Sequence, residues 1–217
     1  MARPQAPQRA AHAGWRQALL HPAAKPLVWL VWLAPAAWLV AAAVLDRLGP
    51  NPAEALIRDT GDWALRALCV ALAVTPLRVL TRTPQLAQYR RLLGLFVFFY
   101  ASLHLACYAT FDMGLDLGEL LLDVAKRPFI LVGMLAWLLL AALAVTSPRR
   151  VARALGGRRW QALHRSVYAV AVLAVLHFLW MRAGKNLVGE VAVYAAVLGG
   201  LLGWRLWQRL RPPRMVA

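Results

Sequence analysis

The 217-residue chain has only nine acidic residues and two cysteines, and it lacks the common nucleotide-binding motifs. Neither a G-x-G-x-x-G fingerprint nor a P-loop occurs, and no polar segment is long enough to form a nucleotide-binding domain. Any chemistry that needs a pyridine nucleotide or a flavoprotein therefore requires a separate chain. Cys69 and Cys107 are not part of a C-x-x-C-H motif, which argues against covalent haem attachment and favours two packed thiols.

Long hydrophobic runs dominate the sequence instead. Hydrophobic residues make up 61% of the chain, and a membrane span needs about 20 predominantly apolar residues. The pattern predicts an all-α integral membrane protein, a bundle of six transmembrane helices, with spans at residues 27–45, 63–80, 92–111, 128–146, 164–181 and 187–207. The second run contains Arg66 and is interrupted by Pro76. We expect a neighbouring helix to satisfy the carbonyl group that this proline leaves free.

The charged residues are segregated between the two sides of this predicted bundle. All nine acidic residues fall on one side, within residues 46–62 and 112–123 and at Glu190, whereas most of the 25 basic residues fall in four short segments on the other. Basic short loops mark the cytoplasmic face, so both termini are predicted to be cytoplasmic, with the loops 46–62 and 112–127 facing outward. Topology and contact with anionic lipid then explain the net charge of +16, and the scattering of the basic residues argues against a nucleic-acid partner.

The polar ends frame a single transmembrane domain. Residues 1–26 are polar and show no cleavable signal, because the apolar run after them is long enough to remain as a span. We therefore expect a cytoplasmic N-terminal segment at 1–26, one transmembrane domain at 27–207 and a basic cytoplasmic tail at 208–217.

Histidines inside the spans are the main candidates for a functional site, because ionisable residues within a membrane are costly. His104 and His177 each lie thirteen residues beyond the cytoplasmic start of a predicted span, and both spans cross in the same direction. This offset corresponds to roughly 20 Å of helical rise, so both imidazoles should lie in the outer half of the membrane. Two facing imidazoles are what a bis-histidine b-type haem requires. The alternative is that each histidine forms only an interhelical hydrogen bond.

His164 is a weaker candidate ligand. It lies beside Arg165 near the cytoplasmic interface, and an ideal helix rotates it roughly 140° away from His177. The corresponding position on the third span is Arg91, which is not a conventional haem ligand. A second haem at His164 would therefore need an unidentified sixth ligand or an open coordination position.

Arginines near the cytoplasmic mouth of the bundle are candidates for cofactor binding. Arg91, Arg158 and Arg159 could bind haem propionates or a flavin phosphate through charge-assisted hydrogen bonds. Positive-inside anchoring is the alternative role for the same residues.

Several stretches resemble one known family. They are NPAEALIRDTGDWALR (51–66), TPLR (75–78), RRLLGLFVFFYASLHLACY (90–108), KRPFI (126–130), GRRWQALHRSVY (157–168) and LHFLW (176–180). Together they resemble the MsrQ (YedZ) family, the haem-binding membrane subunits of periplasmic methionine sulfoxide reductase systems in Gram-negative bacteria, within the ferric-reductase-like transmembrane group. The resemblance covers most of residues 50–182, whereas the first and last spans match only as hydrophobic helices.

The resemblance implies an electron carrier in the bacterial inner membrane, with b-type haem and flavin mononucleotide as cofactors. Electrons would come from the quinone pool or a cytoplasmic flavin reductase and pass to a periplasmic molybdopterin-dependent reductase that repairs oxidised methionine. The family's haem histidines map onto His104, His164 and His177. In NADPH oxidases and ferric reductases the third helix carries two histidines, and here Arg91 takes the cytoplasmic-side position.

Two other functions stay open at the level of the sequence. The leading hypothesis is an electron-transfer subunit without substrate chemistry of its own. A self-contained ferric-reductase-type oxidoreductase is disfavoured because the chain has no attached flavin and nicotinamide domain. A non-redox transporter or scaffold is disfavoured because the spans carry no interior acids and the two halves show no evident repeat.

Overall fold

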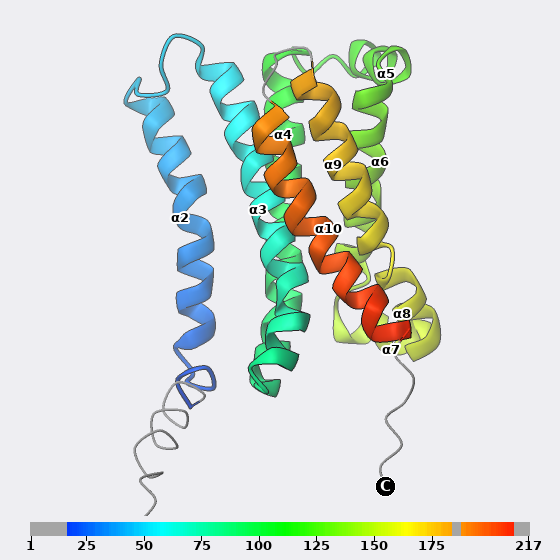
Figure 1. Ribbon diagram of the computed structural model, residues 1–217. Coiled ribbons are helices and arrows are strands. Elements are labelled where there is room, and N and C mark those ends of the chain that lie inside the picture. Colours follow the sequence, from blue (N-terminus) through cyan, green and yellow to red (C-terminus); the bar gives the residue numbers. More distant parts are fainter. Residues whose placement is uncertain (1–16, 184–187, 211–217) are drawn as a thin grey trace, which may run out of the picture.

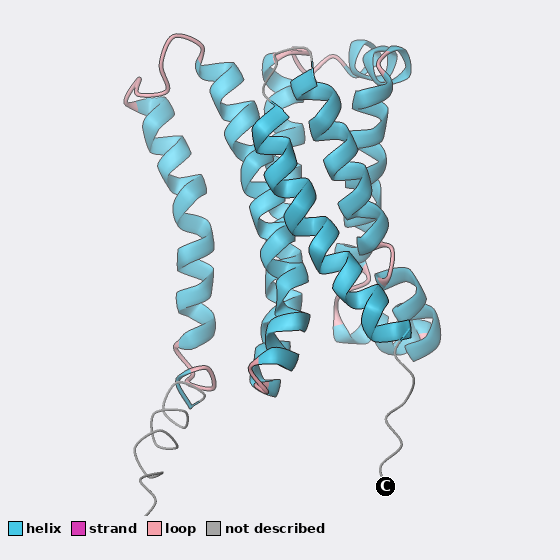
Figure 2. Cartoon of the chain, viewed as in Figure 1, coloured by secondary structure: helices cyan, strands magenta, loops and turns pink. Residues whose placement is uncertain are grey.

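The computed structural model describes residues 17–183 and 188–210, and its regular structure in these ranges is entirely helical (Figures 1 and 2). The short elements are η1 (Pro84–Tyr89), α5 (Leu117–Lys126), α7 (Arg149–Leu155) and α8 (Gly157–His164). The long helices are α2 (Ala24–Val44), α3 (Pro52–Leu80), α4 (Arg90–Phe111), α6 (Pro128–Val145), α9 (Val167–Ala183) and α10 (Val188–Leu210). Parts of the predicted terminal segments, residues 1–16 and 211–217, lie outside the described residues.

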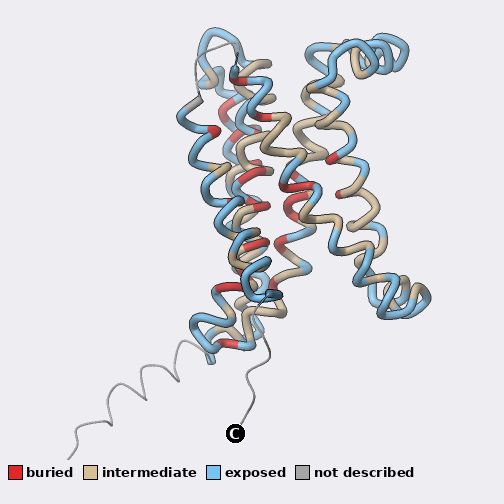
Figure 3. The backbone as a smooth tube through the Cα atoms, turned by 45° about the vertical axis from the view of Figure 1, so that its right-hand side comes forward, coloured by how far each residue is buried: buried red, intermediate tan, exposed pale blue. Residues whose placement is uncertain are grey.

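Five segments are long and apolar enough to cross a membrane: Ala24–Val44, Pro52–Leu80, Pro84–Phe111, Pro128–Val145 and Gly157–Ala183. Large apolar side chains cover their outer surfaces, and Leu30 and Val40 of α2, for example, are 66% and 62% exposed. Figure 3 shows the same distribution, with buried positions inside the bundle and exposed ones around it. Such surfaces are suited to contact with lipid rather than water. The sixth predicted span corresponds to α10, which is not among these five segments.

Two antiparallel helical hairpins form the centre of the bundle, with α3 against α4 and α6 against α9. A continuous cluster of buried apolar side chains joins them, including Leu68, Val97, Leu140 and Val170. Helix α2 packs at the edge, where Ala36 contacts Phe96 and Tyr100 of α4. The hairpins therefore determine which side chains face each other inside the membrane.

Helix α3 begins well before the start predicted at residue 63, so residues 52–62 are helical and the predicted outward loop 46–62 is much shorter. The local sequence explains the early start. Asn51 accepts a hydrogen bond from the backbone N–H of Glu54, Pro52 occupies the first helical turn and Glu54 complements the helix dipole. These capping signals lie outside the apolar run that defined the predicted span.

The proline inside α3 is accommodated by another helix, as predicted. Pro76 has no N–H to donate to Leu72 four residues earlier. The guanidinium of Arg205 on α10 donates to that carbonyl oxygen at 2.6 Å, and the same Nη2 lies 3.1 Å from Oγ1 of Thr75. This contact also attaches α10 to the central hairpins.

The two ends of the bundle differ in charge. The described parts of both chain ends lie at the same end, together with η1, α7 and α8 (Figure 1). The opposite end carries the α2–α3 turn, α5, the end of α9 and the start of α10, which contain or adjoin all nine acidic residues. The predicted loop 112–127 is mostly α5, whose first turn is capped by the carboxylate of Asp116. We call these the basic end and the acidic end.

Candidate functional site

A cavity of about 490 Å³ lies between the two central hairpins and is lined by residues of α3, α4, α6 and α9. His104 of α4 and His177 of α9 both line it, and their ring centroids are 6.2 Å apart with planes at 76°. The sequence placed these two residues at one depth, and the structure brings them together. A cavity of this size is typical of small-molecule and cofactor sites.

The orientation of both imidazoles is fixed by backbone carbonyl groups of the partner helix in each hairpin. Nδ1 of His104 lies 2.8 Å from the carbonyl oxygen of Ile57, and Nδ1 of His177 lies 2.7 Å from that of Phe129. A carbonyl oxygen can only accept, so each Nδ1 carries the hydrogen. Nε2 is the remaining nitrogen of each ring, and this arrangement is typical of metal-ligating histidines.

Two glycines make room for the imidazoles. A Cβ at Gly61 of α3 would stand 3.1 Å from Nδ1 of His104, and a Cβ at Gly133 of α6 would stand 2.9 Å from Nδ1 of His177. Each glycine lies four residues after the carbonyl that accepts from the histidine. Both histidines are therefore held in the same way: a helical carbonyl group accepts from Nδ1, and a glycine one turn later leaves space for the ring.

Sequence reasoning missed these supports, although a signal exists. The carbonyl residue and the histidine are 47 residues apart in the first hairpin and 48 in the second. Comparing the two hairpins would have aligned Gly61 with Gly133 and His104 with His177. The two halves show no evident repeat in sequence, but the two hairpins share this spacing of carbonyl, glycine and histidine.

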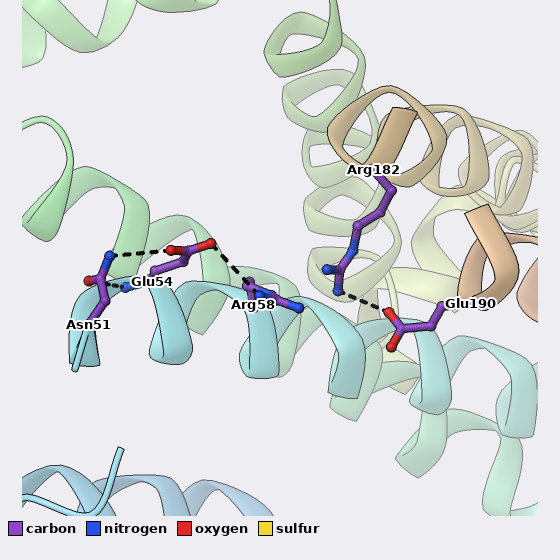
Figure 4. A network of polar contacts seen from close by, with 5 residues as sticks. All are labelled: Asn51, Glu54, Arg58, Arg182 and Glu190. Carbon is purple, nitrogen blue, oxygen red and sulfur yellow. Dashed lines mark hydrogen bonds and ion pairs between the residues drawn. The ribbon is translucent and has the colours of Figure 1, made fainter. Parts of the chain in front are cut away.

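Charged side chains surround the mouth of the cavity at the acidic end. Arg58, Arg127 and Arg182 line it together with the carboxylate of Asp62. Arg182 is 6% exposed and pairs through Nη2 with Oε2 of Glu190 at 3.1 Å, whereas Arg58 pairs with Glu54 on the same helix at 3.8 Å (Figure 4). This rim provides cations close to an otherwise apolar cavity.

The rim is also tied to the support of His177. Tyr108 of α4 donates to Oδ2 of Asp123 at 2.5 Å, and Oδ1 of Asp123 lies 2.9 Å from Nε of Arg127. Arg127 is the N-cap residue of α6 and precedes Phe129 by two positions. The network therefore positions the start of α6, where the carbonyl group of Phe129 accepts the hydrogen bond from His177.

His164 does not line the cavity, and within the apolar segment Gly157–Ala183 it lies before α9 rather than on it. It is the last residue of α8, and a turn at residues 165–166 separates it from α9. Its ring stacks on Trp160 with centroids 4.0 Å apart, and its Nε2 lies 3.2 Å from Oγ1 of Thr146. Apolar side chains, among them Leu72 and Ala171, fill the bundle below the cavity.

The three arginines predicted to bind a cofactor are exposed at the basic end. Arg91 lies on the first turn of α4, and Arg158 and Arg159 lie on α8. An open surface hollow of about 690 Å³ lies between α7 and α8, lined by Arg149, Arg153 and Trp160 among others. The structure therefore does not gather the three residues around the histidine cavity.

Two imidazoles are the metal ligands that the described residues bring together in the cavity. Within the described ranges, no group of three or more His, Cys, Asp or Glu side chains is placed to hold a metal ion. A bare ion bound by protein alone usually takes four or more ligands. Two opposed histidines instead suit a metal whose other ligands come from a planar ring, as in haem.

The chain was compared with protein families and with solved structures. The family described as "Ferric reductase like transmembrane component" matches residues 60–175, which include His104 and end two residues before His177. No solved structure matches the chain.

Curated relatives with the name "Protein-methionine-sulfoxide reductase heme-binding subunit MsrQ" match most of the chain, and three examples follow. The protein from Polaromonas naphthalenivorans is 60% identical over 195 residues, covering 90% of this chain and 89% of its own. The one from Ralstonia nicotianae is 50% identical, covering 88% of each chain. The one from Xanthomonas euvesicatoria pv. vesicatoria is 45% identical, covering 90% of this chain and 91% of its own.

Proposed function

The chain belongs to the MsrQ family, within the ferric-reductase-like transmembrane proteins, and from this premise we propose that it is a membrane b-type cytochrome. It binds one haem between His104 and His177 and carries electrons to a methionine sulfoxide reductase. The haem and the reductase enter this proposal from the name that the relatives carry. The single observation that carries the proposal is the pair of imidazoles in one cavity, each fixed through Nδ1 by a helical carbonyl.

The residues of the cavity fit a haem. Two imidazoles that bind one metal from opposite sides, each at about 2 Å, have ring centroids about 6 Å apart, and the observed separation is 6.2 Å. The remaining lining is largely apolar, with side chains such as Leu68 and Val97 on the side of the basic end. When bound, the haem supplies one-electron oxidation and reduction at its iron. The chain itself orients the two Nε2 atoms and excludes water from between the hairpins.

The rim arginines fit the carboxylates of the same group. Arg58, Arg127 and Arg182 would hold the haem propionates at the acidic end, because arginine pairs with carboxylates through charge-assisted hydrogen bonds. A second haem at His164 has no comparable support, because that histidine contacts Thr146 and Trp160 instead.

We further propose a six-span topology with both termini in the cytoplasm of a bacterium and the protein in its inner membrane. The five apolar segments, the attachment of α10 through Arg205 and the segregated charges support it. Residues 1–26 would be a cytoplasmic segment, 27–207 the haem-binding transmembrane domain and 208–217 a basic tail that meets anionic lipid. The acidic end then faces the periplasm, with the proposed haem close to it.

The partners follow from this direction. The acceptor would be a periplasmic molybdopterin-dependent reductase that docks at the acidic end. The donor would be the quinone pool or a cytoplasmic flavin reductase at the basic end. The flavin mononucleotide stays a prediction from the family resemblance. In this proposal the chain is an electron-transfer subunit that carries out no substrate chemistry by itself.

Replacement of each cavity histidine tests the proposal. We expect His104→Ala and His177→Ala each to abolish the low-spin haem spectrum of the purified protein, because either change removes one axial ligand. His21→Ala, which changes an exposed histidine outside the bundle, is the matched control and should keep full haem content. A colourless wild-type protein would refute both the electron-transfer function and the alternative of a self-contained ferric-reductase-type oxidoreductase. Full haem content in His104→Ala would show that the pairing is wrong.

A further inference from the structure

Arg90, at the start of α4, presents an unpartnered guanidinium edge at the basic end of the bundle. Its Nε and Nη2 atoms are buried and have no hydrogen-bond partner among the described residues. These two atoms form the edge of arginine that binds carboxylate or phosphate through two parallel hydrogen bonds. Buried charged groups without partners are costly, so native proteins usually pair them.

More positive charge surrounds this edge. Arg78 and Arg205 lie near enough to Arg90 to repel it, and Tyr168 of α9 lies near enough to interact with it favourably. Nη1 of Arg205 is also buried and unpartnered within the described part of the chain, although Nη2 is bound to the carbonyl of Leu72. The guanidinium of Arg205 lies 5.2 Å from the ring centroid of Tyr168. Two incompletely satisfied arginines thus share one aromatic neighbour.

No acidic side chain of the protein can neutralise this group. All nine acidic residues lie within residues 46–62 and 112–123 or at position 190, and therefore at the other end of the bundle. The N-termini of α4 and α9 both lie at the basic end, and helix N-termini carry partial positive charge. Ser166, just before α9 at this end of the bundle, has a buried hydroxyl without a partner among the described residues. All these features favour the binding of an anion that is not part of the chain.

We propose that Arg90 and Arg205 form a binding site for a phosphate group at the basic end of the bundle. A tetrahedral phosphate offers oxygens in several directions, which suits donors from two helices, α4 and α10, better than a planar carboxylate does. The phosphate comes either from an anionic phospholipid or from a soluble phosphate ester such as flavin mononucleotide. The site lies apart from the cavity histidines, so this proposal does not rest on haem binding.

Thermal unfolding of the full-length protein in detergent, after removal of lipid, tests the site. The probes are inorganic phosphate, phosphatidylglycerol with diacylglycerol as its phosphate-free control, and flavin mononucleotide with riboflavin as its control. Ionic strength is matched with potassium chloride. We expect a phosphate-bearing probe to raise the Tm of the wild type. Arg90→Gln should weaken the apparent affinity by roughly ten-fold or more, because it removes a charge-assisted pair of hydrogen bonds.

Arg150→Gln is the matched control, because Arg150 is an exposed arginine on α7 at the same end of the bundle. It should respond to the probes as the wild type does. A response to phosphatidylglycerol alone would identify a lipid headgroup, and a response to flavin mononucleotide but not riboflavin would identify a soluble ester. The proposal is overturned if no probe shifts the wild-type Tm, or if Arg90→Gln responds as strongly as the wild type.

A second variant keeps the test decisive. With no phosphate present, Arg90→Met should match or exceed the wild-type Tm, because it removes a buried charge that has no partner. A clear loss of Tm in Arg90→Met would mean that the guanidinium is satisfied within the protein, and that result would also overturn the proposal.

Discussion

Gly133 of α6 lies directly against His177 of α9, so that a Cβ at position 133 would stand 2.9 Å from both Nδ1 and Cε1 of the imidazole. Non-bonded heavy atoms prefer separations of about 3.5–4.0 Å. The glycine is therefore part of the histidine site, although it carries no functional group. The equivalent contact in the other hairpin, between Gly61 and His104, is slightly looser at 3.1 Å.

We expect Gly133→Ala to displace the imidazole of His177 and to weaken haem binding, because overpacking of this kind costs about 1–3 kcal/mol. Gly61→Ala should have the same effect at smaller magnitude. Gly94→Ala on α4 is the control, since a Cβ there has no neighbour within 4 Å. The haem-to-protein ratio and the low-spin absorbance bands measure the outcome. Equal haem content in Gly133→Ala and Gly94→Ala would contradict the role assigned to Gly133.

His164→Ala should leave the proposed haem between His104 and His177 in place, because His164 lies outside the cavity. The variant loses the contact with Oγ1 of Thr146 and the stacking on Trp160, so stability should fall by about 1 kcal/mol. Reduction by the cytoplasmic donor is measured on the same sample and is expected to slow, since this residue lies at the basic end. Loss of all haem in His164→Ala would require a different pair of ligands.

Arg182→Gln should lower the midpoint potential of the proposed haem by tens of millivolts. A cation at the cavity rim favours the extra electron, and Arg182 is a buried cation that lines the cavity. Glu190 is 57% exposed and can be hydrated once its partner is gone. Spectroscopic redox titration measures the change, with Arg47→Gln on the exposed α2–α3 turn as the control. An equal shift in both variants would mean that only overall charge matters.

Neutralising Asp112 and Glu119 together should slow electron delivery to the periplasmic partner and reduce its salt dependence. Charge complementarity mainly sets encounter rates. Both residues are exposed at the acidic end. Asp116 and Asp123 are left unchanged, because the former caps α5 and the latter binds Tyr108 and Arg127. Stopped-flow reoxidation across a salt series measures the rate, and an unaltered rate and salt slope would exclude this surface.

Glu54→Gln on α3 provides a comparison for that experiment. Its carboxylate lies at the same end but pairs with Arg58 and Asn51 within its own helix start. We expect a smaller effect on electron delivery than in the double variant, because a paired charge contributes less to the long-range field.

The membrane character and the histidine pair could be predicted from the sequence, because both depend on regular helical spacing. Apolar runs identified five segments that the structure also identifies, and the equal offsets of His104 and His177 placed the two rings at one depth. The expected rescue of the Pro76 position was also correct in kind, but only the structure identifies Arg205 as the donor.

Other features depended on contacts that no local pattern encodes. The early start of α3 follows from capping at Asn51, outside the apolar run, and the turn after His164 removes that residue from α9. The imidazoles are held in place by hydrogen bonds to the carbonyl groups of Ile57 and Phe129. These pairs form because helices nearly fifty residues apart in sequence pack together. The sequence by itself therefore determined which segments are apolar enough to span a membrane and how far along them the histidines lie, because helical rise is uniform. Only the tertiary structure decided which faces meet, because that depends on how the side chains and the gaps at Gly61 and Gly133 fit together.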